Sequence, residues 1–408
     1  MDFLEPSSSD NTTILNGKQN NLHSNKMVIK VGLIGLSSVT TNVSASPGDS
    51  WAASAHLPYL LASPHYEIVA LCNSSVKSAQ TAAQRYNLPS SVKAYGNSED
   101  LAKDPDVDLV VCSVRVDRHH QLMMPVIKAG KDVYVEWPLA SNLTQATEMY
   151  TAAQKSGSKT IVGLQARSSP FVRKIKELVA NKTVGDLLSS TLEFTVGWAG
   201  DVDPPAADYF AKKECGGNFL TIPFGHTADP VLHALGGLEE LSALLTTRWP
   251  EIKYLHGDGS FDRMIKRETP DHVLLQGTLK NNSAPISMAA RNGKGFKDSP
   301  NIVWRIFGTK GEIRLTSAAM LSLALDGEKI EVFDHETDTV EVVNVEYAEV
   351  VKDLSPFAKN IGMLYEGFVK GWGVEEGFVD FEQAVGMHTI IDCMEKSSED
   401  RKYKKIAV

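Results

Sequence analysis

The stretch KVGLIGL, residues 30–36, is a short apolar run that ends at a glycine and a leucine. After a polar loop, the stretch WAASAHLPYLLAS at 51–63 places apolar residues at the spacing of a helix. The pattern therefore predicts a strand, a loop and a helix in that order. A strand that is apolar at nearly every position is typical of a sheet covered on both faces.

The same alternation of strands and helices continues to about residue 168. The predicted strands are at 66–73, 107–115, 132–136 and 160–167, and the predicted helices between them are at 75–88, 121–130 and 143–157. Apolar strands that alternate with helices of about three turns favour a doubly wound parallel sheet of the dinucleotide-binding (Rossmann) type. The N-terminal half is therefore predicted to be α/β.

The pattern changes after Pro170. A helix is predicted at 171–181, strands at 188–198, 272–280, 284–291, 302–309 and 311–317, and late helices at 355–373 and 381–400. Alternating and β-branched strands indicate an α+β domain on a mainly antiparallel, open sheet, with the C-terminal helices packing back on the body. The predicted units are a disordered tail at 1–28, a Rossmann domain at 29–168, and an α+β substrate and dimerisation domain at 169–408.

Composition excludes several functional classes. The chain has 408 residues, a net charge of −9 and a pI of about 5.7, so it lacks the basic surface that direct nucleic-acid binding needs. The four cysteines are scattered without metal-ligand spacing, which indicates a reduced, intracellular chain and no metal. The N-terminal segment has no sustained apolar run, so no signal peptide or membrane span is expected. We expect a cytoplasmic or nuclear protein.

The turn after the first strand is a degraded phosphate-binding motif. Gly35 is the first glycine, Ser37 stands at the second glycine position, and a longer loop replaces the third. Small hydroxyl residues and a helix start can still donate hydrogen bonds to phosphate. After the second strand, Asn73, Ser74 and Ser75 stand where an NAD-selective site has an acid, so NADP is permitted and mildly favoured over NAD.

Several local matches then occur in one order along the chain. They are VGLIGL at 31–36, DLVVCSVRVDRHH at 108–120, AGKDVYVEWPLA at 129–140, ARSSPFVRKIKELV at 166–179, GGNFLTIPFGHTAD at 216–229, IFGTKGEIRL at 306–315 and FEQAVGMHTIIDCMEKS at 381–397. With this ordered set, the chain resembles the Gfo/Idh/MocA family of nicotinamide-dependent oxidoreductases over residues 29–408. The resemblance implies NAD or NADP as cofactor and a homodimer formed through the open sheet.

The resemblance also implies which residues lie at the cofactor. The expected cofactor-binding residues are Gly35, Leu36, Ser37, Trp51, Asn73, Ser74, Ser113, Val114, His119, Glu136, Trp137, Gln165 and Arg167. Hydride transfer from an alcohol needs a group that takes the hydroxyl proton. In the family this group is the lysine of a Glu-Lys-Pro signature, assisted by an aspartate and a histidine.

This chain departs from that pattern at two positions. Trp137 stands where the family has the lysine, and an indole can donate a hydrogen bond but cannot accept a proton. If His226 matches the family histidine, Ile222 stands where the aspartate would be. His226 and Tyr209 are therefore the candidate catalytic residues. Trp137 either lies against the nicotinamide or a ligand ring, or fills the seam between the domains.

Two functions remain open at this point. Within the family, VEW at 135–137, FGHTAD at 224–229 and PDHVLLQGTL at 270–279 are more similar to the fungal branch of the yeast galactose-regulon co-repressor than to working dehydrogenases. One hypothesis is an oxidoreductase acting on a sugar, a polyol or a secondary-metabolite intermediate. The other is a catalytically silent, dinucleotide-binding regulator with a protein partner.

Overall fold

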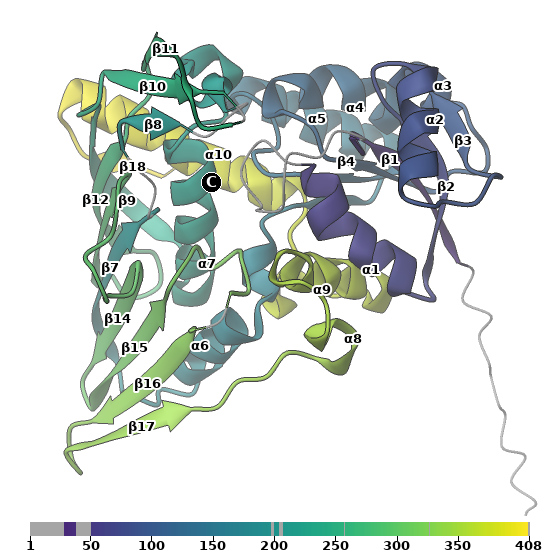
Figure 1. The fold of residues 1–408 in the computed structure, drawn as a ribbon. Helices are drawn as coiled ribbons and strands as arrows, with labels where there is room; N and C mark the ends of the chain where they lie inside the picture. Colours follow the sequence, from purple (N-terminus) through teal and green to yellow (C-terminus); the bar gives the residue numbers. More distant parts are fainter. Residues whose placement is uncertain are drawn as a thin grey trace, which may run out of the picture.

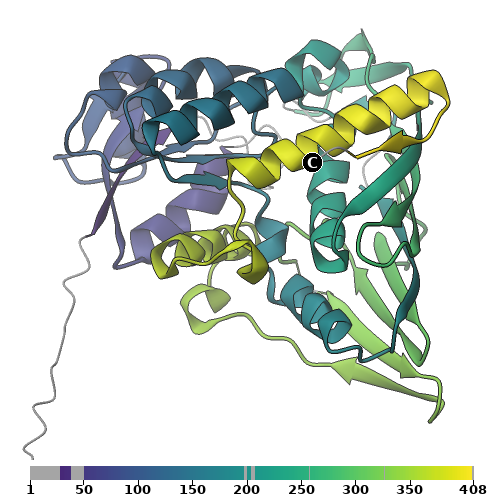
Figure 2. The ribbon, with the colours of Figure 1, turned by 180° about the vertical axis from the view of Figure 1, so that it is seen from behind.

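A computed structural model describes residues 28–37, 50–196, 200–203, 207–256, 258–325 and 327–406. The predicted tail at 1–28 lies outside these residues except for Val28. Figure 1 shows a parallel sheet with its helices at upper right and a larger sheet at left. Helices fill the space between the two sheets, as the opposite view in Figure 2 also shows.

The first sheet has six parallel strands in the order β3-β2-β1-β4-β5-β6. The strands are β1 (Ile29–Ile34), β2 (Tyr66–Cys72), β3 (Lys93–Tyr95), β4 (Leu109–Cys112), β5 (Asp132–Val135) and β6 (Thr160–Val162). Their side chains are largely buried, as the apolar runs predict. The predicted doubly wound sheet is confirmed. Its strand order reverses between β1 and β4, where folds of this type bind ligands at the carboxyl ends of the strands.

One predicted strand is shorter than expected. The prediction runs from 160 to 167, but β6 ends at Val162 and a short 3-10 helix, η3 (Gln165–Ser168), follows. The chain leaves the sheet at Gly163, where an added Cβ would lie only 2.7 Å from the carboxylate oxygens of Glu136. The turn therefore brings Gln165 and Arg167 to the carboxyl end of the sheet.

The helices of this half are α1 (Leu57–Ala62), α2 (Val76–Arg85), α3 (Ser98–Ala102), α4 (His119–Lys128) and α5 (Leu143–Ser156), and a π-helical turn η1 (Ala52–His56) precedes α1. Side chains of Ser75, Asn97 and Asn142 accept hydrogen bonds from backbone N–H groups in the first turns of α2, α3 and α5. These N-caps explain why the three helices begin where they do.

The second sheet has nine strands in the order β17-β16-β15-β14-β7-β13-β12-β9-β18. The strands are β7 (Leu187–Thr195), β9 (Leu238–Thr246), β12 (His272–Leu279), β13 (Pro285–Arg291), β14 (Ile302–Gly308), β15 (Gly311–Ser317), β16 (Lys329–Asp334), β17 (Thr339–Val343) and β18 (Lys404–Lys405). Neighbours are antiparallel except for the parallel pair β7 and β13. The mainly antiparallel second sheet is confirmed.

Three helices cover the inner face of this sheet. They are α6 (Pro170–Ala180), α7 (Gly225–Leu235) and α10 (Phe381–Asp400), and α10 runs from the sheet toward the Rossmann half in both views (Figures 1 and 2). In the described part of the chain, no helix lies over the opposite face of the sheet. No helix of the described residues is long and apolar enough to cross a membrane.

The late helices return to the first half of the chain. α9 (Pro356–Lys370), which follows the short α8 (Glu349–Lys352), shares a buried core with α1 and β2 through Tyr365, Tyr59 and Tyr66. Residues from the C-terminal part of the sequence thus complete the core of the Rossmann half. The proposed boundary between 168 and 169 stays a prediction.

Two features were not predicted: a small third sheet and a π-helical turn before α7. The sheet has the order β11-β10-β8, with β8 (Val202–Asp203), β10 (Glu251–Leu255) and β11 (Phe261–Lys266), and lies near the 3-10 helix η4 (Asp208–Ala211). A π-helical turn η6 (Leu220–Phe224) leads into α7. His226 lies in the first turn of α7.

Candidate cofactor and active site

The turn after β1 is built so that only glycine fits at its centre. Gly35 has a φ of 98°, and a Cβ added there would lie 2.2 Å from the carbonyl oxygen of Ser113 and 2.6 Å from Cγ1 of Val114. The backbone after β4 therefore passes directly against the turn after β1. A glycine at this position of the first turn, packed closely against its neighbours, is what a dinucleotide-binding fold has.

Residues at the end of β2 brace the same turn. The side-chain amide of Asn73 donates to the carbonyl of Leu36 at 2.9 Å, and the hydroxyl of Tyr86 donates to the carbonyl of Ser37 at 2.8 Å. Ser74 is exposed beside them. None of these side chains is acidic, so nothing here repels a 2′-phosphate. Residues 38–49 of the loop lie outside the described residues.

Glu136 follows directly after the carboxyl end of β5 and is 7% exposed. Its Oε1 lies 2.9 Å from Nε2 of His56, and Nδ1 of the same imidazole lies 2.8 Å from the hydroxyl of Tyr365. His56 and Tyr365 are fully buried. Sequence reasoning missed this network because its members are far apart in the chain and show no local motif.

Trp137 is only 4% exposed and lies between the two halves. Its indole N–H donates to the carbonyl of Thr221 in η6 at 2.7 Å, and its ring centre lies 4.7 Å from that of His388 on α10. Of the two alternatives, the indole in this structure fills the seam. A contact between Trp137 and the cofactor stays a prediction.

His226 lies beside this seam and is 7% exposed. The preceding Gly225 faces the indole, because an added Cβ there would lie 2.8 Å from Nε1 of Trp137. Nδ1 of His226 is buried and has no hydrogen-bond partner among the described residues. Burial lowers the pKa of His226 to about 4, and the negative charges of Glu136 and Asp229 offset only part of that effect. The imidazole is therefore neutral at pH 7.

Asp229 is bonded to Arg167 and does not cap α7. It lies inside α7 and accepts two hydrogen bonds from Arg167, at 2.8 Å from Nε and 2.6 Å from the terminal nitrogen. Arg167 also donates to Oε1 of Gln383 on α10 at 3.1 Å. This buried ion pair ties η3 to α7. The predicted contact of Arg167 with the cofactor stays a prediction.

Two further predicted residues line the carboxyl end of the Rossmann sheet. His119 places its ring nitrogens 2.9 Å from the carbonyl of Pro138 and 3.0 Å from that of Val114, so it joins the loops after β4 and β5. Burial lowers the pKa of His119. Gln165 donates to the carbonyl of Ser322 at 3.4 Å, while its buried Oε1 has no partner in the described part of the chain.

Tyr209 and Trp51 lie at the margins of this region. The ring of Tyr209, on η4, lies 4.9 Å from the guanidinium carbon of Arg115. Burial raises the pKa of Tyr209 to about 12, so at neutral pH the phenol can donate a proton but is a poor acceptor. Trp51 packs edge-on against Phe357 of α9 with ring centres 6.1 Å apart. Both assigned roles stay predictions.

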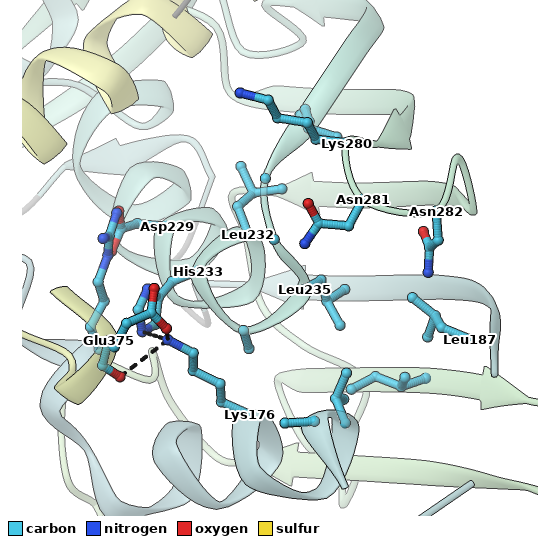
Figure 3. A pocket seen from close by; sticks show the side chains of 18 of the residues that line it. Lys176, Leu187, Asp229, Leu232, His233, Leu235, Lys280, Asn281, Asn282 and Glu375 are labelled. Carbon is cyan, nitrogen blue, oxygen red and sulfur yellow. Dashed lines mark hydrogen bonds and ion pairs between the residues drawn. The ribbon is translucent and has the colours of Figure 1, made fainter. Parts of the chain in front are cut away.

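A cavity of about 980 Å³ opens on the other side of α7, between α6 and α10 (Figure 3). At one end, Nζ of Lys176 lies 2.7 Å from the carboxylate of Glu375 and 3.3 Å from Nε2 of His233. Leu232 and Leu235 line the cavity near Lys280, Asn281 and Asn282. The buried pair of Arg167 and Asp229 forms part of its wall. No sequence motif indicated this cavity, since its lining comes from segments that are far apart in the sequence.

The described residues contain no group of three or more His, Cys, Asp or Glu side chains that could hold a metal ion. The polar groups that converge at the carboxyl end of the parallel sheet are instead those of a dinucleotide site. The open turn at Gly35, the uncharged Asn73 and the unpaired Oε1 of Gln165 are all consistent with a bound nicotinamide dinucleotide.

Known proteins share this arrangement. Residues 48–164 match the family described as "Oxidoreductase family, NAD-binding Rossmann fold", and residues 170–317 match "Gal80p, C-terminal domain". The galactose/lactose metabolism regulatory protein GAL80 of Saccharomyces cerevisiae is 31% identical over 72% of this chain and 68% of its own length. Dehydrogenase aclE of Aspergillus oryzae is 31% identical over 82% of this chain and 87% of its own length.

Similarity of structure agrees with similarity of sequence. A super-repressor mutant of Gal80p from Saccharomyces cerevisiae superposes with a TM-score of 0.82 at 26% identity, covering 93% of this chain and 98% of that chain. A transcriptional regulator therefore shares this fold with the chain. On the matched sequences and the shared fold, the chain belongs to the Gfo/Idh/MocA family of NAD-binding oxidoreductases and carries a C-terminal domain of the Gal80p type.

Proposed function

We propose that this protein is a nicotinamide-dependent oxidoreductase that uses His226 to transfer the proton, in place of the family lysine. The observation that carries the proposal is the buried Nδ1 of His226, which has no partner in the described part of the chain. An unsatisfied buried nitrogen costs free energy, so its persistence needs an explanation. A substrate hydroxyl that donates to this nitrogen provides one.

The residues have separable tasks in this reaction. Gly35 allows the tight turn after β1 at which the pyrophosphate would bind, and the uncharged Asn73 and Ser74 would not repel an adenine ribose with a 2′-phosphate. When bound, the nicotinamide ring supplies the hydride acceptor. As a secondary alcohol is oxidised, its C–H bond loses a hydride, its O–H bond loses a proton to neutral His226, and a C=O bond forms. His226 then releases the proton to solvent.

The substrate class is a sugar, a polyol or a secondary-metabolite intermediate. Dehydrogenase aclE supports an enzymatic role, because it is aligned over most of both chains. In this chain Trp137 closes the position at which a lysine would otherwise stand, so binding of the substrate depends on the groups that remain around His226.

A second function is favoured by a different observation. The indole of Trp137 donates to the carbonyl of Thr221 and packs against the ring of His388. Ile222 stands where the family has an aspartate. Two of the three proton-handling positions of the family are thus filled by groups that cannot take part. A catalytically silent protein whose dinucleotide tunes binding of a regulatory partner would fit these residues, and GAL80 is a regulatory protein of related sequence.

Single-turnover absorbance at 340 nm separates the two functions. Excess protein is mixed with NADPH, NADP⁺, NADH or NAD⁺ and with sugars, polyols, aldehydes and a metabolite extract. We expect an absorbance change with the wild type that falls by at least about 100-fold in His226→Gln. His233→Gln is the matched control, since His233 lies on the same helix but faces the cavity beside Lys176.

A flat trace would overturn the oxidoreductase if calorimetry shows that the dinucleotide binds in the same samples. It would favour the silent regulator. Equal rates in the wild type and in His226→Gln would instead assign the proton transfer to another group.

We also infer that two copies pair through the outer face of the nine-stranded sheet. Leu274 and Phe307 are exposed on strands β12 and β14, on the face that no described helix covers. Leu274→Arg is expected to yield monomers in light scattering, because it places a charge in the interface. Leu61→Arg, which changes an exposed leucine on α1, is the control. A dimer that survives Leu274→Arg would place the interface elsewhere.

A further inference from the structure

A buried chain of three polar groups ends at the carboxyl edge of the Rossmann sheet. The hydroxyl of Tyr365 on α9 lies 2.8 Å from Nδ1 of His56, and Nε2 of His56 lies 2.9 Å from Oε1 of Glu136. Tyr134 packs edge-on against the imidazole at 4.9 Å between ring centres. Both His56 and Tyr365 are fully buried, so water does not compete for these hydrogen bonds.

The hydrogen bonds of this chain hold the carboxylate of Glu136 in place. Burial raises the pKa of Tyr365 well above its ordinary value, so its phenol keeps the proton. A phenol that donates to Nδ1 of His56 leaves the imidazole hydrogen on Nε2, where it is donated to Glu136. With this order of donors, the negative charge of the three groups is that of Glu136.

Glu136 lies in the half of the sheet that receives the nicotinamide. In a doubly wound fold the adenine half of a dinucleotide lies on the side of β2, and the other half lies over β4, β5 and β6. Glu136 follows β5 directly, and its carboxylate packs against Gly163 after β6, where a Cβ would not fit. Among the described residues, the ion pair of Glu136 is with His56 alone.

Other charged groups near this edge are already balanced. Arg167 is paired with Asp229, and Arg115 with Asp117. His226 is neutral at pH 7 because burial lowers its pKa to about 4. The charge of Glu136 is therefore the one that a bound ring would experience most strongly.

We propose that Glu136 makes the site bind the oxidised, cationic nicotinamide in preference to the reduced, neutral one, and that His56 and Tyr365 maintain this preference. The ring of the oxidised cofactor carries a positive charge that hydride transfer removes, while the rest of the cofactor is unchanged. A carboxylate at a partly buried edge attracts the first form and not the second. The preference concerns binding, so it holds for an enzyme or for a silent regulator.

Calorimetric dissociation constants for NAD⁺, NADH, NADP⁺ and NADPH test the proposal. The measured quantity is the ratio of the constants for the reduced and oxidised forms. We expect Glu136→Gln to lower this ratio by about tenfold, since it removes the charge and keeps the shape. Tyr365→Phe should lower it by several-fold, because it removes the hydroxyl that holds His56 in its hydrogen bond with Glu136.

Tyr66→Phe is the matched control for Tyr365→Phe. Tyr66 is also buried, its hydroxyl donates to the backbone carbonyl of Tyr365 at 2.8 Å, and it does not contact His56. The substitution Tyr66→Phe removes a hydroxyl from the same buried cluster as Tyr365→Phe does. The ratio of the dissociation constants for the reduced and oxidised forms should therefore stay at the wild-type value. If Glu136→Gln does not fold, the comparison of Tyr365→Phe with Tyr66→Phe decides the question.

Three outcomes would overturn the proposal. A ratio that is unchanged in Glu136→Gln while both forms bind more weakly would leave Glu136 a purely structural role. An equal fall of the ratio in Tyr365→Phe and in Tyr66→Phe would show that the bond between Tyr365 and His56 does not maintain the preference. Failure of the wild type to bind either form would overturn the site itself. A flat 340 nm trace with the ratio intact would count only against the oxidoreductase.

Discussion

The two walls of the interdomain seam differ in how their buried histidines are satisfied. On the Rossmann wall, both ring nitrogens of His56 and of His119 lie within hydrogen-bond distance of a partner, although Oε1 of Gln165 has none in the described part of the chain. On the opposite wall, Nδ1 of His226 and Nε2 of His388 are buried without a partner in the described part of the chain. A partnered group is held in place, whereas an unpartnered one destabilises the protein until a ligand or water satisfies it.

The difference follows from the elements that build each wall. The Rossmann wall consists of strand ends and loops, whose free carbonyl and N–H groups accept and donate to nearby side chains, as at His119. The other wall consists of α7 and α10, whose backbone groups are satisfied within the helices. A histidine that faces inward from a helix therefore depends on a side chain, water or a ligand for its second hydrogen bond.

Acid should destabilise the helical wall most strongly. Burial lowers the pKa of His226 to about 4 and that of His388 to about 3. Both values lie below that of an unfolded histidine, so the stabilising contribution is complete above about pH 6.5 and is lost as the pH falls toward 4. Each histidine should lower the free energy of unfolding by about 1.4 kcal/mol per pH unit in this window. Urea unfolding between pH 7.5 and 4.5 measures the slope.

His388→Leu isolates one of these contributions. It should reduce the slope by about 1.4 kcal/mol per pH unit, because one titrating group is removed. Equal slopes for the wild type and His388→Leu would show that His388 is not held neutral, and would weaken the contrast between the walls.

The ion pair between Arg167 and Asp229 connects the two walls and should give the next largest effect. Asp229→Ala leaves the buried guanidinium of Arg167 without its carboxylate. We expect the free energy of unfolding to fall by about 3–5 kcal/mol. Denaturant unfolding at pH 7.5 measures the loss.

A double variant supplies the control for the ion pair. Arg167→Met combined with Asp229→Leu removes both charges and should recover most of the stability, because no unpaired charge stays buried. A double variant as unstable as Asp229→Ala would show that packing, and not charge, holds the walls together at this point.

Replacement of Trp137 by phenylalanine should have a smaller effect. Trp137→Phe leaves the carbonyl of Thr221 without its donor and leaves space next to Gly225. The expected loss is about 2 kcal/mol, the cost of an unsatisfied buried acceptor. Thermal and denaturant unfolding measure it. Trp372→Phe, at an indole that lies under the guanidinium of Arg173, is the control. Equal losses would mean that the bond to Thr221 contributes nothing specific.

The sequence predicted the Rossmann wall better than the helical wall of α7 and α10. The runs at 30–36, 108–112 and 132–135 are local patterns, and they place the carboxyl ends of β1, β4 and β5 at one edge of a sheet. Gly35 and Glu136 were found because they directly follow such runs. Their partners were not found, since His56 and Tyr365 are 309 positions apart and meet only when α9 packs on α1.

The helical wall was harder to predict because its geometry depends on irregular backbone. The π-helical turn η6 places Thr221 under Trp137 and moves the start of α7 to Gly225, five residues before Pro230. A proline inside a helix argues against that helix in any sequence-based interpretation. The small sheet of β8, β10 and β11 was missed for a related reason, since its strands are short and β8 has only two residues.

The smallest effect on stability is expected on the Rossmann wall, where the same substitution should also change the dissociation constants of the cofactor. Tyr86→Phe removes the hydroxyl that donates to the carbonyl of Ser37. One net hydrogen bond contributes about 1 kcal/mol, so the melting temperature should fall slightly. The dissociation constants for NAD⁺ and NADH should rise by equal factors, because the turn is loosened while Glu136 is unchanged. Tyr150→Phe, which removes a hydroxyl bonded to Gln154 on the surface of α5, is the control. A change in the ratio of the two constants in Tyr86→Phe would mean that the turn, and not only Glu136, distinguishes the redox state of the cofactor.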